Sequence, residues 1–120
     1  MIRIESLHHV AVCVTDVDAA RRFYTEVLGF TERSDRPDFG FPGAWLDVGG
    51  QQVHLMQVAD MPPGAASQHF ALRVDDLDAA VEAIEARGVS VYRAEHTPNA
   101  GRQAFLADPS GNGIELNQPD

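Results

Sequence analysis

The sequence predicts an α+β fold made of two tandem βαβββ modules, which form an open, cupped sheet around a cavity. The first observation is an internal repeat. A shift of 60 residues places His9 to Ala20 (HVAVCVTDVDAA) on His69 to Ala80 (HFALRVDDLDAA), with seven of twelve positions identical. The second observation is that each copy begins with apolar residues at alternate positions, as in a strand, and continues with apolar residues at helical spacing.

The elements of each module can be placed in chain order. Strands are expected over 9–14 and 69–74, and each is followed by an aspartate that is a candidate N-cap, Asp16 or Asp76. Gly29 and Gly88 stand where a left-handed C-cap is expected, so they should end the two helices. The remaining strand-like segments lie at 30–33, 44–48 and 52–58 in the first module, and at 89–93, 102–106 and 113–117 in the second.

The chain is expected to be a single domain. Its 120 residues fit one ordinary domain, and a module of about 60 residues would bury too little surface alone. We expect module one at about 1–59, a connector rich in proline, glycine and small residues at about 60–67, and module two at about 68–120.

Composition excludes several classes of function. A formal net charge of -9 would repel a phosphate backbone, so nucleic acid is not an expected partner. No apolar window is long enough to span a membrane, and the start MIRIESLHH lacks the features of a signal peptide, so a cytoplasmic location is expected. Cys13 is the only cysteine, so an intrachain disulfide and a thiolate metal cluster are both excluded.

Four residues that can ligate a metal occupy positions related by the repeat. His9 falls on His69, and the match of Gly49 to Leu55 with Ser110 to Leu116 places His54 on Glu115. Strand alternation puts all four on the face opposite the helices. Three imidazoles and one carboxylate suit a first-row divalent cation, and zinc, nickel, cobalt, manganese and iron would all be accepted. His8 and His96 fall outside this pattern.

The runs DVDAARRFYTEVLGF (16–30) and DPSGNGIEL (108–116) resemble the vicinal oxygen chelate superfamily, which includes glyoxalases, bleomycin-resistance proteins and extradiol dioxygenases. The resemblance covers nearly the whole chain. It implies one divalent metal ion per site, held by His9, His54, His69 and Glu115. It also implies a homodimer with shared sites, although the sequence does not decide whether modules pair within or between chains.

The resemblance favours a glyoxalase-like lyase or isomerase acting on a small substrate that is chelated through vicinal oxygens. Glu115 would then move a proton, with the metal stabilising an enediolate. Glyoxalase I usually has a carboxylate where His54 stands and a glutathione-binding arginine where Cys13 stands, so glutathione is not the expected cosubstrate. Arg73, the repeat mate of Cys13, could hold a substrate anion instead.

Two alternatives remain open. In an Fe(II) extradiol dioxygenase, His9, His69 and Glu115 would form the facial triad, and His54 would be an acid or base beside it. Phe105 stands where the extradiol signature has a catalytic tyrosine, which argues against ring cleavage. A metal-free protein that sequesters an antibiotic, as bleomycin-resistance proteins do, is the other alternative.

Other residues are candidates for the substrate pocket. They lie on the predicted open face or in its strands, and they are Arg73, Trp45, Met56, Cys13 and Phe105. The loop DRPDFGFPG (35–43), with glycine, proline and two phenylalanines, is a candidate lid over the cavity.

Overall fold

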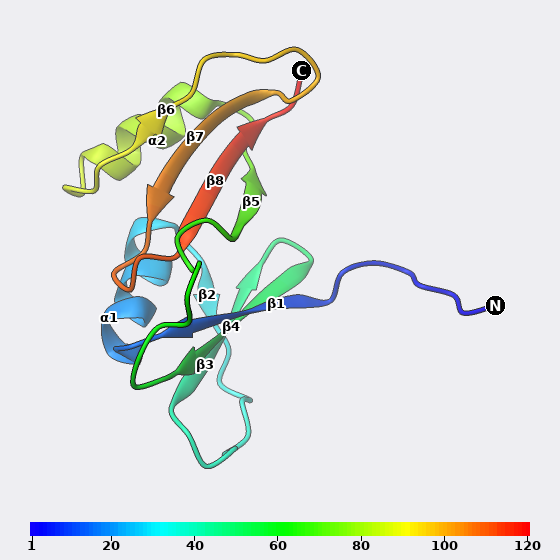
Figure 1. The fold of residues 1–120 in the computed structure, drawn as a ribbon, viewed down its shortest axis with the longest axis vertical. Helices are drawn as coiled ribbons and strands as arrows, with labels where there is room; N and C mark the ends of the chain where they lie inside the picture. Colours follow the sequence, from blue (N-terminus) through cyan, green and yellow to red (C-terminus); the bar gives the residue numbers. More distant parts are fainter. The chain divides into compact units, whose positions relative to one another are not determined.

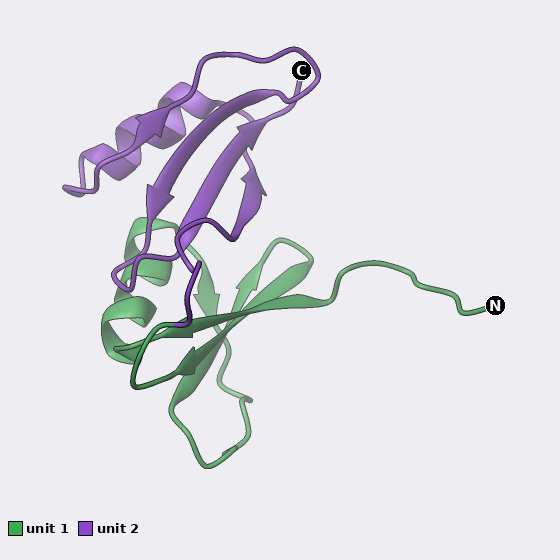
Figure 2. Ribbon diagram, viewed as in Figure 1, with its two compact units in different colours: residues 1–61 green, residues 62–120 purple.

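The computed structural model describes residues 1–120 as two compact units, Met1–Met61 and Pro62–Asp120 (Figure 2). The boundary falls within the segment rich in proline and small residues that the sequence marks as a connector. Each unit contains one helical segment and one four-stranded mixed sheet (Figure 1). The chain is thus the α+β protein that the repeat predicts, with two βαβββ modules in tandem.

The first unit builds its sheet in the order β1-β4-β3-β2. Strand β1 pairs in parallel with β4, and the other neighbours are antiparallel. The parallel pair requires a crossover, which the helical segment supplies. The elements are β1 (His9–Val14), α1 (Val17–Arg22), a π-helical turn (Phe23–Val27), β2 (Thr31–Glu32), β3 (Gly43–Val48) and β4 (Gln51–Gln57).

The second unit repeats this arrangement with the sheet order β5-β8-β7-β6. Again the first strand pairs in parallel with the last, and the remaining pairs are antiparallel. The elements are β5 (His69–Arg73), α2 (Leu77–Glu85), β6 (Tyr92–Arg93), β7 (Arg102–Ala107) and β8 (Gly113–Gln118). The outermost strands β2 and β6 are shorter than the alternating patterns predict, with two residues each.

Both helical segments begin at the predicted aspartate caps, and both predicted glycines adopt the left-handed conformation, although α1 itself ends at Arg22 and α2 at Glu85. Oδ1 of Asp16 accepts a hydrogen bond from the Ala19 amide at 3.1 Å, and Oδ1 of Asp76 accepts one from the Ala79 amide at 3.0 Å. Gly29 and Gly88 have φ angles of +76° and +83°, in the left-handed region that a side chain would disfavour. Neither helix is long and apolar enough to cross a membrane.

One local feature departs from the sequence pattern. The apolar spacing from Val17 to Val27 predicts one regular helix, but the backbone widens to a π-helical turn at Phe23. The hydroxyl of Thr25 donates to the Arg21 carbonyl at 2.7 Å, and the Leu28 amide reaches back five residues to the Phe23 carbonyl at 3.3 Å. Such a bulge depends on local hydrogen bonding that apolar periodicity does not reveal.

The core of each unit lies between its sheet and its helix. In the first unit Val14, Leu46 and Leu55 are fully buried together with Tyr24. In the second unit Val81 and Ile114 take the corresponding role. Because strand side chains alternate, burial of one face leaves the neighbouring positions on the opposite face, where the predicted ligands lie.

Candidate functional site: two equivalent ligand pairs

The first unit brings His9 and His54 together. Their rings stack with centroids 3.9 Å apart and planes 15° apart. The pair arises from the parallel register of β1 and β4, in which His9 is the Cα partner of Gln52, two residues before His54. Both side chains therefore lie on the same face of neighbouring strands. A second imidazole contact comes from His8, whose Nδ1 lies 2.9 Å from Nδ1 of His9.

The second unit brings His69 and Glu115 together in the same register. His69 is the Cα partner of Gly113, again two residues before the second ligand. Nε2 of His69 lies 3.2 Å from Oε1 of Glu115. The Glu115 side chain is only 9% exposed, whereas the His69 side chain is 42% exposed. The duplicated sequence thus produces a duplicated geometry, with one pair of candidate ligands in each unit.

Glu115 is held by amides that sequence analysis did not single out. Its Oε2 accepts hydrogen bonds from Nδ2 of Asn117 at 2.8 Å and from Nε2 of Gln103 at 3.1 Å. Burial opposes ionisation, but the hydrogen bonds from Asn117, Gln103 and His69 outweigh it and lower the pKa of Glu115. One carboxylate oxygen is therefore fixed by the protein, and the other faces the imidazole.

His54 has a similar amide neighbour. Its Nε2 lies 2.8 Å from Oε1 of Gln52, which is two residues earlier on β4. Partial burial lowers the pKa of His54, and repulsion from the cationic forms of His9 and His8 lowers it further. A neutral imidazole is the form that binds a metal. Strand alternation could have found Gln52 and Asn117, because each lies two residues from a predicted ligand on the same face.

The predicted pocket residues divide between the two units. In the first unit, Trp45 is the Cα partner of His54 and stacks on it, with centroids 4.6 Å apart and planes 14° apart. Cys13 and Met56 are Cα partners in the β1–β4 pair, and both are half-buried. Cys13 lies four residues after His9 on β1, so of these three side chains the structure records a ring contact with the histidine pair only for Trp45.

In the second unit, Phe105 is the Cα partner of Glu115, the position equivalent to Trp45. Its ring meets that of His69 edge to face at 5.8 Å between centroids. Arg73 is exposed and is the Cα partner of Asn117, on the strand that also carries His69. Two other arginines of this sheet, Arg102 on β7 and Arg93 on β6, both form ion pairs with Asp78.

The donor set fits a divalent metal, although neither unit completes a site. No group of three or more histidine, cysteine, aspartate or glutamate side chains converges in the structure. Each unit supplies two donors, imidazole with imidazole in one and imidazole with carboxylate in the other. These nitrogen and oxygen donors are those that zinc and its first-row neighbours accept. A four-ligand site would need both pairs.

Known proteins resemble the chain over nearly its whole length. It is 33% identical to a probable lactoylglutathione lyase of Vibrio cholerae, over 92% of this chain and 88% of that protein. It is 35% identical, with a TM-score of 0.84 and full coverage of both chains, to TnmS3, an antibiotic binding protein from Streptomyces sp. CB03234.

A third similarity concerns the fold alone. The fosfomycin resistance protein FosX of Listeria monocytogenes, solved as an E126Q mutant with Mn(II), shares 19% identity and a TM-score of 0.83, over 98% of this chain and 95% of that chain. The strongest assignment comes from a sequence model that matches residues 6–116. By that match the chain belongs to the Glyoxalase/Bleomycin resistance protein/Dioxygenase superfamily.

Proposed function

We propose that the protein is a divalent-metal-dependent, glyoxalase-like lyase or isomerase, in which His9, His54, His69 and Glu115 hold the metal. The observation that carries the proposal is the equivalent register of the two ligand pairs, since each first ligand pairs with the residue two positions before the second. Duplication has thus preserved a donor pair on both sheets. Identity of 33% to a probable lactoylglutathione lyase supports the same class of reaction.

A bound metal would supply Lewis acidity toward two adjacent oxygens of a small substrate. Glu115 would be the proton carrier, because its Oε2 is held by Asn117 and Gln103 while Oε1 stays directed at His69. A carboxylate fixed at one oxygen can exchange a proton at the other without losing its position. Arg73, exposed on the strand of His69, would bind an anionic part of the substrate.

The complete site would join the pair of one unit to the pair of another, within one chain or between two chains of a homodimer. Both arrangements use the same four residues, so single variants give the same result in either case. Heterodimers of two different variants distinguish them. Co-expression of a His9→Ala chain with a Glu115→Gln chain would restore about one site in a heterodimer only if sites are shared between chains.

Metal content is the decisive measurement. Purified, untagged protein is stripped with a chelator, reloaded anaerobically with zinc, nickel, cobalt, manganese or iron, and subjected to elemental analysis. We expect about one metal per chain in the wild type, and strongly reduced retention in His9→Ala, His69→Ala and Glu115→Gln. His96→Gln is the matched control, because His96 binds Asp120 outside both pairs. Failure to reload any metal would refute the proposal.

The class of reaction is determined by assaying the activity of the metal-reloaded protein. A 2-oxoaldehyde is supplied with and without a thiol cosubstrate, and isomerisation is monitored. Retention of iron with ring cleavage of a catechol would instead support the dioxygenase alternative, in which His9, His69 and Glu115 ligate Fe(II). We rank that alternative lower because Phe105, the strand partner of Glu115, lacks the hydroxyl of the extradiol signature.

A second candidate function is sequestration of a small molecule without a metal. The observation that favours it is 35% identity, over both full chains, to an antibiotic binding protein. Ligand affinity that is unchanged by chelation, in protein that binds no metal, would favour this function over the enzyme.

A further inference from the structure

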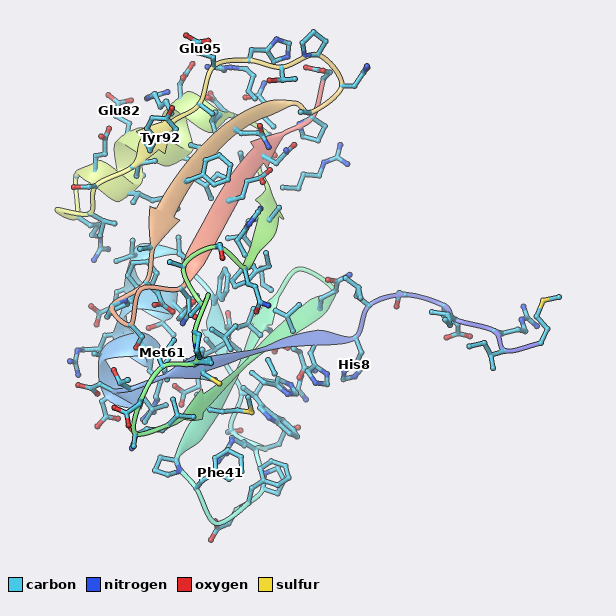
Figure 3. The ribbon with its side chains drawn as sticks, viewed as in Figure 1. His8, Phe41, Met61, Glu82, Tyr92 and Glu95 are labelled. Carbon is cyan, nitrogen blue, oxygen red and sulfur yellow. The ribbon has the colours of Figure 1, made fainter.

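The loop that joins β2 to β3 carries an ordered group of aromatic rings. The rings of Phe39 and Phe41 lie 6.0 Å apart between centroids with planes 23° apart. Cζ of Arg36 lies 5.1 Å from each centroid, so one guanidinium covers part of both rings. The two phenylalanines are nevertheless 52% and 41% exposed. Figure 3 shows Phe41 on this loop.

These rings continue into the first ligand pair. The ring centroids of Phe39 and Trp45 lie 6.0 Å apart, and the Trp45 ring stacks on the His54 ring with centroids 4.6 Å apart. His54 in turn stacks on His9 at 3.9 Å. A row of rings therefore leads from an exposed loop to the two histidines, all within the first unit. Exposed aromatic side chains arranged in contact offer a surface on which a flat ligand can stack.

Arg36 is the charged member of this surface, and no acidic side chain neutralises it. Its guanidinium donates to the Phe41 carbonyl at 3.2 Å and forms no ion pair. By contrast, Arg33 on the same loop binds both Asp35 and Asp47. In a chain with a net charge of -9, an unpaired guanidinium beside exposed rings is complementary to an anion.

We propose that Arg36, Phe39, Phe41 and Trp45 form a binding surface for a planar aromatic molecule that carries an anionic group. The ring system stacks on the phenylalanines and Trp45, and the anionic group meets Arg36. The surface leads to His54, so the bound ring would be presented to the ligand pair. That presentation rests on the proposed function, whereas the stacking itself does not need a metal.

The test compares three matched probes on chelator-treated wild-type protein. They are 2-naphthoate, its saturated analogue decahydronaphthalene-2-carboxylate, and the uncharged 2-naphthamide. Trp45 is the only tryptophan, so its fluorescence reports binding at this surface, and calorimetry gives the Kd. We expect 2-naphthoate to bind about tenfold more tightly than either analogue, since stacking and charge pairing each contribute on that scale. Equal affinity for the saturated analogue would overturn the proposal.

Variants localise the binding. Phe39→Leu and Arg36→Gln should each weaken 2-naphthoate binding several-fold. Tyr92→Leu is the matched control, because Tyr92 is an aromatic residue, 67% exposed, on β6 of the second unit. Unchanged affinity in both loop variants would refute the assignment. If Phe39→Leu loses its native circular dichroism, the Arg36→Gln variant and the probe comparison on wild type still decide the question.

Two further outcomes separate this inference from the proposed function. Metal binding without preferential binding of 2-naphthoate would overturn the aromatic surface and leave the enzyme proposal intact. Preferential binding in protein that takes up no metal would support the surface and count against the enzyme. If a second copy of the chain covers the rings instead, 2-naphthoate would not bind and Phe39→Leu would weaken self-association in sedimentation, which also overturns the proposal.

Discussion

Nε2 of His69 lies 3.2 Å from Oε1 of Glu115, and the two residues come from strands whose register matches that of His9 and His54 in the other unit. The two pairs are therefore equivalent in the structure as well as in the sequence repeat. A residue on β5 and one on β8 meet because parallel neighbours place positions offset by two on one face. The same offset on β1 and β4 produces the histidine pair.

The role of His54 can be separated from that of its neighbours. If His54 is a metal ligand, His54→Ala should lower metal affinity by more than about 100-fold, because loss of an outer-shell partner alone costs about 10- to 100-fold in metal affinity or activity. If it acts beside the metal, the variant should retain metal and mainly lose turnover. Competition with a chelator gives the affinity, and kcat is measured on fully loaded protein.

Gln52→Leu is the matched control for this prediction, since Gln52 contacts His54 on the same strand without being a proposed ligand. We expect its metal affinity to fall less than that of His54→Ala. Equal affinity in wild type and His54→Ala would argue against a four-ligand glyoxalase-like site.

The amides around Glu115 should be measurable through its titration in metal-free protein. Asn117, Gln103 and His69 lower the pKa of Glu115 against the opposing effect of burial. Replacing Gln103 by methionine removes one donor while nearly preserving volume, so the pKa of Glu115 should rise. Carboxyl carbon shifts in NMR would follow it. A pKa of Glu115 that is unchanged in Gln103→Met would show that this hydrogen bond does not stabilise the carboxylate.

Much of this fold follows from sequence because local signals and the repeat agree. Asp16 and Asp76 cap their helices, and Gly29 and Gly88 adopt positive φ, as their residue types require. Strand alternation predicts that the candidate ligands lie on the faces opposite the helices, and the structure brings His9 to His54 in one unit and His69 to Glu115 in the other. The caps, the positive φ angles and the strand alternation depend on residues that are close together in the chain, so they can be predicted from the sequence.

Other features depend on contacts that no local pattern encodes. The position of Arg36 over two phenylalanine rings follows from the path of a loop, and the π-helical turn follows from back-bonding by Thr25. The contact of Gln103 with Glu115 crosses from β7 to β8, so it requires the register of that pair. How the ligand pairs are combined is likewise a tertiary or quaternary matter, which the repeat leaves open.

Asp16 and Asp76 cap equivalent helices in the two modules, so we expect them to contribute equally to the free energy of unfolding. Asp16→Ala and Asp76→Ala each leave an amide at the start of a helix without its side-chain acceptor. We expect each to lower the free energy of unfolding by about 1 kcal/mol, within the range of about 0.5–2 kcal/mol for such caps. Urea denaturation measures this, with Asp75→Ala as the control. Loss of stability in Asp75→Ala as large as in Asp76→Ala would mean that capping is not the cause.

Asp78 links the helix of the second unit to its strands and should make stability depend on pH. Its carboxylate binds Arg102 at 2.9 Å and Arg93 at 2.6 Å. The hydrogen bond from Arg102 lowers the pKa of Asp78 most, and the one from Arg93 lowers it further. A carboxyl group whose pKa is depressed on folding stabilises the native state above its unfolded pKa, about 3.9. That contribution is lost as pH falls through the folded pKa.

Asp78→Asn should therefore lower Tm slightly at pH 7, and the difference from wild type should vanish at pH values below the folded pKa. The effect should be small and weakened by salt, because the Asp78 side chain is 60% exposed. Glu82→Gln on the same helix is the control, since Glu82 is exposed and forms no ion pair in the structure. A Tm difference that persists unchanged into acid would contradict an ionic role, because the protonated aspartate and the asparagine would then have to differ for another reason.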